Sequence, residues 1–98
     1  MSTLHLVRQS AFVTNDFAQC LHVLGQQDGL VLMDDGCYNL SHTLMQSLIQ
    51  QENNTVSLNI MTSHAHARAI MPLKEVQLID IAELVDLTFT YGTVITWQ

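Results

Sequence analysis

The stretch Gly29 to Met33, GLVLM (residues 29–33), contains no polar side chain. A strand with one face in water alternates apolar and polar residues, whereas an unbroken apolar run is typical of a strand buried on both faces. Strands of this kind belong to parallel sheets that helices cover on both sides. The stretch therefore predicts an α/β fold with a layer of helices on each side of a sheet.

The rest of the chain alternates between short apolar segments and amphipathic ones. Asp80 and Glu83 have nearly the spacing of a capping box, and Ser41 is a suitable first residue for an earlier helix. Residues 52–54 (ENN) should end that earlier helix. We expect strands at 3–7, 29–33, 55–61, 76–79 and 93–97, and helices at 15–24, after Ser41 and after Asp80. This order predicts one domain, residues 1–98, with five strands in a mostly parallel sheet.

In such folds, functional sites lie at the carboxyl edge of the sheet, in the loops that lead from strands to helices. The segment DDGCYNL, residues 34–40, follows the buried strand directly and carries Cys37. A helix amino terminus lowers the pKa of a thiol, but the carboxylates of Asp34 and Asp35 oppose a thiolate. Cys37 is therefore predicted to be a small, partly buried loop residue.

Cys20 is the other thiol, and it should lie at the edge of the apolar stripe of the first helix. It falls in the carboxyl-terminal half of that helix, where the helix dipole disfavours a negative charge. His22 is two positions away, so its ring points to another side of the helix. From the residues alone, Cys20 is predicted to be a packing residue.

The histidines offer weak metal or catalytic candidates. His64 and His66 would share a face on a strand but point apart on a helix, and their segment contains no cysteine or carboxylate. We expect a solvated loop or a short helix that Ser63 caps. His5 is predicted to be a hydrogen-bonded structural residue, and His42 an exposed residue near a helix start. Because phosphate-binding loops and GxSxG elbows are absent as well, the sequence predicts no metal and no cofactor.

The net charge of the chain argues against some classes of function. Three basic residues face nine acidic ones, for a net charge of -6, so we expect no direct binding of nucleic acid. The sequence shows neither a signal peptide nor an apolar run long enough to cross a membrane, so we expect a cytoplasmic protein with reduced thiols.

Charged residues make up only 12% of the chain, against about 25% in typical soluble domains. Either other subunits cover part of the surface, or Gln, Asn, Ser and Thr coat it. The charge deficit favours subunit contacts.

Several short segments, taken in order, resemble the TusB/DsrH family of sulfur-relay subunits with the DsrE-like fold. The resemblance spans essentially the whole chain and ends near Trp97. The segments are LHLV (4–7), QSAF (9–12), NDFAQCL (15–21), DDGCYNL (34–40), LIDIAELVDLT (78–88) and VITWQ (94–98).

The resemblance implies a flavodoxin-like three-layer sandwich and a place in a relay of persulfide sulfur. TusB-type chains assemble with TusC-like and TusD-like subunits as a dimer of heterotrimers, which passes sulfur through a TusE-like acceptor toward 2-thiolation of the tRNA wobble uridine. The principal sulfur-carrying cysteine belongs to the TusD/DsrE subunit. Cys20 matches a first-helix cysteine of DsrH-type members that is implicated in sulfur transfer, whereas Cys37 matches no cysteine of the family.

The expected role is mainly structural, with Cys20 as a candidate persulfide carrier. Two alternatives stay open: a DsrH-like subunit of a sulfur-oxidation complex, and a stand-alone persulfide sulfurtransferase that acts through Cys20 or Cys37. Purified without partners, the chain should self-associate or aggregate.

Overall fold

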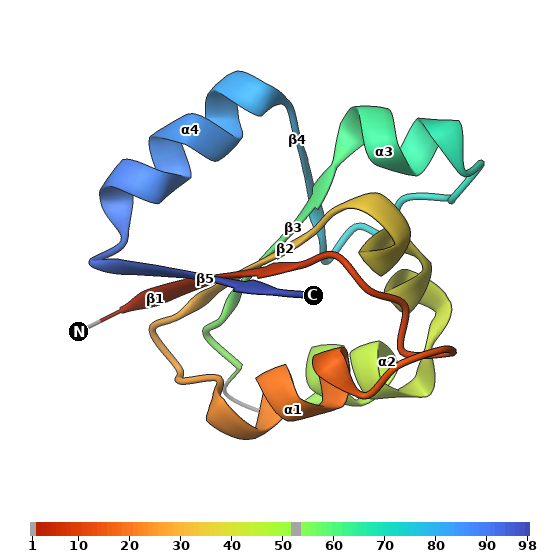
Figure 1. The fold of residues 1–98 in the computed structure, drawn as a ribbon, viewed down its shortest axis with the longest axis horizontal. Coiled ribbons are helices and arrows are strands. Elements are labelled where there is room, and N and C mark those ends of the chain that lie inside the picture. The colour runs from red at the N-terminus through yellow and green to blue at the C-terminus, as the bar shows by residue number, and fades with distance from the viewer. Residues whose placement is uncertain (1, 52–53) are drawn as a thin grey trace.

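The computed structural model describes residues 2–51 and 54–98. Its centre is a five-stranded sheet in the order β4-β3-β2-β1-β5, in which every pairing is parallel (Figure 1). The strands are β1 (Thr3–Val7), β2 (Gly29–Leu32), β3 (Ser57–Met61), β4 (Gln77–Ile79) and β5 (Thr93–Trp97). The expected strands are confirmed to within two residues, and GLVLM supplies the central strand.

Helices cover both faces of the sheet, which confirms the flavodoxin-like sandwich. Figure 1 shows α1 and α2 on one face and α4 across the other, with α3 near the carboxyl ends of β2 and β3. The helices are α1 (Asp16–Val23), η1 (Asp34–Ser41, a 3-10 helix), α2 (Thr43–Gln50), α3 (Thr62–Ala67) and α4 (Ile81–Thr90).

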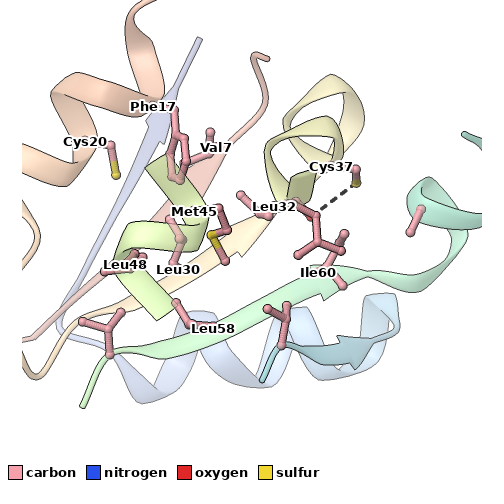
Figure 2. Close-up of a cluster of buried hydrophobic side chains, with 14 residues drawn as sticks. Val7, Phe17, Cys20, Leu30, Leu32, Cys37, Met45, Leu48, Leu58 and Ile60 are labelled. Atoms are coloured by element: carbon pink, nitrogen blue, oxygen red, sulfur yellow. Dashed lines mark hydrogen bonds between the residues drawn. The ribbon is translucent and has the colours of Figure 1, made fainter. Parts of the chain in front are cut away.

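The two cores follow the alternation of side chains along each strand. On β2, Leu30 and Leu32 point toward α1 and α2, whereas Val31 points toward α4. Figure 2 shows the larger core, in which Phe17 of α1 and Met45 of α2 meet the sheet. The smaller core beneath α4 comprises Leu4, Val31, Met61, Ile79 and Leu84. β2 is buried along its whole length because both cores use it.

The predicted helix cap at Asp80 is confirmed. Asp80 accepts a hydrogen bond from the amide of Glu83 at 2.8 Å, and the Glu83 carboxylate accepts one from the amide of Asp80 at 3.1 Å. The Ser41 prediction was wrong, because His42 caps α2 through its ring Nδ1, which accepts from the amide of Leu44 at 3.0 Å. The expected break at 52–54 falls partly outside the described residues.

Two segments contain helical turns; the first was expected to be a loop, and the second a loop or a short helix. Residues 34–40, expected to be a loop, belong to η1. Residues 62–67 form α3, and Ser63 does not cap it because the helix already begins at Thr62. Among the helices in the described part of the chain, none has the length and apolar character needed to span a membrane.

Candidate functional site

The carboxyl ends of β1, β2 and β3 meet η1 and α3, and close packing there depends on Gly36. The amide of Gly36 donates to the carbonyls of Arg8 at 3.1 Å and Met33 at 2.9 Å. A Cβ at this position would lie 2.0 Å from the carbonyl oxygen of Val7. Because the backbone fixes the position of a Cβ and the carbonyl oxygen is itself a backbone atom, no side-chain rotation relieves that contact. The glycine therefore allows η1 to rest directly on the end of β1.

A buried amide joins η1 to the loop after β1. The Asn39 Oδ1 accepts from the amide of Ala11 at 2.7 Å, and its Nδ2 donates to the carbonyl of Gln9 at 3.1 Å. Asn39 is fully buried, and these bonds give each polar atom of its side chain a partner. The amide thereby fixes the loop against η1.

Two ion pairs hold the aspartates of DDGCYNL. Arg8 Nε lies 2.7 Å from Asp34 Oδ2, and Arg68 Nε lies 3.1 Å from Asp35 Oδ1. His64 also belongs to this cluster, because its Nδ1 accepts from the amide of Asp34 at 2.9 Å. Charged and polar side chains from the segments after β1, β2 and β3 thus meet at DDGCYNL.

The two histidines of HAHAR lie on α3, two positions apart. His64 is engaged with the backbone of η1, and His66 is exposed. Within residues 2–51 and 54–98, no three His, Cys, Asp or Glu side chains are grouped closely enough to hold a metal ion.

Cys37 is fully buried in the larger core, so the expectation of a partly buried loop residue was wrong. Its Sγ lies 3.7 Å from the carbonyl oxygen of Leu32, to which it donates (Figure 2). Burial raises the pKa of Cys37 to about 11; the Arg68 charge lowers it, and Asp34 and Asp35 raise it. At neutral pH the group is a thiol that packs in the core.

Cys20 lies in the same core, on the inward side of α1 next to Phe17 (Figure 2). The sequence led us to expect Cys20 at the edge of the apolar stripe, but its side chain is fully buried. Burial and, to a smaller extent, the charge of Asp28 raise the pKa of Cys20 to about 12. In this conformation the group is a protonated thiol away from solvent.

A buried polar chain links both ends of the described fold. His5 Nε2 lies 3.0 Å from Asp28 Oδ2, and the Trp97 indole donates to His5 Nδ1 at 3.1 Å. Burial raises the pKa of Asp28, but hydrogen bonds from the Gly25 and Thr3 amides and the contact with His5 outweigh it, so the pKa lies below its usual range. The prediction of a hydrogen-bonded structural His5 is confirmed. The sequence did not identify Asp28, whose only local signal is its place before the buried strand.

An apolar groove of about 730 Å³ opens beside η1. Its walls come from η1, α2 and the connection after α3, segments that are far apart in sequence. The lining includes Tyr38, Leu40, Ile49, Ile70, Met71 and Leu73, with Arg68 and Glu75 as charged members. Sequence reasoning missed this groove, although Met71 and Leu73 in a solvent-exposed connection were a signal.

The arrangement does not prepare either thiol for nucleophilic attack. A catalytic cysteine needs a neighbouring base or cation that stabilises its thiolate. Among the hydrogen bonds of the described residues, neither Cys20 nor Cys37 is paired with a histidine. The polar groups of the site instead connect elements of the fold.

Comparison with known proteins places this geometry in a family. A family model described as "DsrH like protein" matches residues 9–94. The fold is similar to the solution structure of protein Tm0979 from Thermotoga maritima, with a TM-score of 0.59 and 18% sequence identity over 90% of this chain and 92% of that one. No curated protein matches the chain. With the family model covering most of its length, the chain belongs to the DsrH-like family, whose members are sulfur-relay subunits that work in complexes with other such subunits.

Proposed function

We propose that this chain is the TusB-type subunit of a cytoplasmic sulfur relay that delivers persulfide sulfur for 2-thiolation of the tRNA wobble uridine. Its 98 residues act as one domain that completes the complex around a catalytic TusD-like subunit. The observation that carries this proposal is the state of the two thiols. Both are buried and protonated at neutral pH, which suits a subunit whose partners carry the sulfur.

The proposed assembly is a dimer of heterotrimers with TusC-like and TusD-like subunits, which hands sulfur to a TusE-like acceptor. An acidic surface is compatible with this role because another component of the pathway holds the tRNA. Purified alone, the chain should self-associate through apolar surface meant for its partners. Sedimentation of the isolated chain as a well-behaved monomer at all concentrations would contradict that expectation.

The test is sulfur transfer in a reconstituted complex. The TusC-like and TusD-like subunits of the same organism are combined with and without this chain, and labelled sulfur is followed from a persulfide donor to the TusE-like acceptor. Transfer should require this chain and should survive the substitutions Cys20→Ala and Cys37→Ala. Equal transfer in its absence would refute the proposal.

A persulfide on Cys20 is a secondary proposal, supported by the family position of this cysteine. The Cys20 thiolate would attack the terminal sulfur of a donor persulfide; a new S–S bond would form, and the donor would leave as a thiolate. Because Cys20 is buried, α1 would have to move away from the sheet first. Transfer that Cys20→Ser leaves unchanged would eliminate this role. A stand-alone sulfurtransferase would take up one sulfur atom in isolation, which intact-protein mass spectrometry would detect.

A second candidate function is a DsrH-like role in a sulfur-oxidation complex. The description of the matching family model favours it. Identification of the acceptor protein that receives the sulfur separates the two pathways. Loss of wobble-uridine thiolation after deletion of the gene would support the first, and unchanged thiolation would support the second.

A further inference from the structure

The outward side of α4 carries an exposed apolar stripe. Ile81, Val85 and Phe89 recur every four residues and therefore share one side of the helix. Phe89 is 84% exposed and Val85 47%. A different side of α4 packs on the sheet through Leu84 and Leu87. The helix is therefore apolar on two sides, whereas a helix that meets only its own core has one apolar face.

The position of the acidic side of α4 shows toward which strands the apolar stripe of this helix is turned. Glu83 and Asp86 line a polar cleft of about 250 Å³ together with Asn59 of β3 and Gln77 of β4. Because this flank is turned toward β3 and β4, the apolar flank is turned toward β1 and β5, at the other end of the sheet.

The strand below that flank extends the apolar surface. Val94 of β5 pairs in register with Leu4, which belongs to the core beneath α4, so Val94 lies on the same face of the sheet as α4. Its side chain is 40% exposed. Figure 1 shows α4 leading directly into β5. Ile81, Val85, Phe89 and Val94 together are called the α4–β5 surface.

The outer edge of β5 lacks the features that protect an edge strand. Within the described residues β5 is the last strand of the sheet, and its sequence TVITW contains no charge and no proline. Exposed, uncharged edges of this kind pair readily with other chains unless something covers them. A surface of two adjoining uncovered apolar elements is typical of a subunit interface.

The charges near the α4–β5 surface help to decide whether a second copy of this chain or a different protein binds there. Every charged side chain from residue 75 onward is acidic, so the charges nearest the α4–β5 surface in sequence are carboxylates, such as Asp86 three positions before Phe89. A second copy of this chain offers little matching positive charge: Arg8 and Arg68 are engaged with Asp34 and Asp35 at the carboxyl edge, Lys74 is the remaining basic side chain, and each copy carries a net charge of -6. An antiparallel pair of α4 helices about a two-fold axis would also bring the two acidic flanks together.

We infer that the α4–β5 surface docks a different sulfur-relay subunit, one with an apolar face bordered by Lys or Arg side chains. The inference rests on the proposed function, because it takes the partner to be one of the TusC-like or TusD-like subunits. Interfaces of this kind have an apolar centre, and rim charges set the rate of association.

The experiment measures affinity for the purified TusC-like and TusD-like subunits of the same organism. Val85→Gln and Phe89→Gln remove apolar surface, and the glutamine that they introduce is a good helix former. Val23→Gln is the control for Val85, because Val23 is a 58% exposed valine on α1, on the other side of the sheet. Val94→Thr is compared with Ile95→Thr, the neighbouring position on the opposite face of β5, whose exposure of 38% is close to that of Val94.

The α4 variants should weaken binding by about tenfold, in the range of strong interface positions, whereas Val23→Gln and Ile95→Thr should bind like the wild type. Asp86→Asn should slow association and reduce its salt dependence. Circular dichroism verifies that each variant is folded, as expected for exposed positions.

The outcomes separate the two proposals. Normal binding by the α4 variants, with the wild type also binding, would overturn the docking surface and leave the proposed function standing. Failure of the wild type to bind either subunit would overturn the proposed function and this partner with it. A dimer of this chain that Val85→Gln dissociates, and that the other subunits do not displace, would show that a second copy is the occupant and overturn the inference.

Discussion

The carboxylate of Asp28 is expected to contribute more to stability than any surface charge. Its Oδ1 accepts from the amide of Thr3 at 2.9 Å, and its Oδ2 accepts from the amide of Gly25 at 2.9 Å and meets His5 Nε2 at 3.0 Å. Because the indole of Trp97 donates to His5 Nδ1, the proton of the ring lies on Nε2. Asp28 therefore receives three donors. The substitution Asp28→Asn supplies one acceptor oxygen in place of two.

The loss can be worked out from these contacts. If the amide oxygen of the new side chain faces Gly25 and His5, its NH2 group faces the amide of Thr3, and one donor loses its acceptor. A buried donor without a partner costs about 1–3 kcal/mol. Loss of the negative charge weakens the two remaining bonds by about 1 kcal/mol in all. Asp28→Asn should therefore lower the free energy of unfolding by about 2–4 kcal/mol.

The effect should also depend on pH. The pKa of Asp28 is lower in the folded chain than its usual value of about 3.9 in the unfolded chain. Its contribution is fully present above that value and is lost as the pH falls through the lower folded pKa. The difference in stability between wild type and Asp28→Asn should therefore shrink in acid.

Urea unfolding, followed by circular dichroism at low protein concentration, measures both effects. Asp86→Asn is the control, because Asp86 is an exposed carboxylate on α4. The experiment compares about pH 7 with the lowest pH at which the fold persists. The reasoning is refuted if Asp28→Asn costs no more than Asp86→Asn, or if its cost is the same at both pH values.

Three further substitutions or modifications test the packing described above. Gly36→Ala forces a Cβ against a backbone carbonyl of β1 and should cost about 1–3 kcal/mol or more in urea unfolding; a neutral effect would show that η1 can shift. Trp97→Phe removes the donor to His5 Nδ1 and should cost about 1 kcal/mol by the same measurement; no loss would mean that the bond contributes nothing. At about pH 8, Cys20 and Cys37 should react with a thiol reagent only after unfolding in urea, because both are buried with raised pKa values; rapid labelling of the native chain would contradict their placement.

Features that depend on neighbours in sequence could be predicted. GLVLM indicates a strand buried on both faces by itself, and the structure places it at the centre of the sheet. The three-residue spacing of Asp80 and Glu83 is enough to form the capping box. Fold class and most element bounds follow from such local patterns because each pattern reports which face of an element must be buried.

Features that depend on contacts between segments far apart in sequence could not be predicted. The pairs Arg8–Asp34 and Arg68–Asp35 join residues 26 and 33 positions apart, and no spacing rule connects them. The aspartates beside Cys37 therefore looked like unpaired charges, whereas the fold supplies each with an arginine.

The prediction of the residue that caps α2 was wrong for a different reason. Ser41 and His42 are adjacent, both have an acceptor atom, and the choice between them rests on one residue of register. The Ser41 hydroxyl donates instead to the carbonyl of Tyr38 at 3.2 Å, within η1. Ser41 thus still belongs to η1, whereas His42 has the extended backbone of an N-cap residue and its ring accepts from the amide of Leu44.

The place of β5 next to β1 has a consequence for synthesis of the protein. In the sheet, β1 lies between β2 and β5, and the contact between His5 of β1 and Trp97 of β5 joins residues 92 positions apart. Until β5 emerges, β1 exposes an uncovered edge, and pairings over such long separations form slowly. A nascent chain in this state can pair with other nascent chains. Emergence of residues 93–97 is therefore the step at which the edge of β1 becomes covered and the exposed edge of the sheet passes to β5.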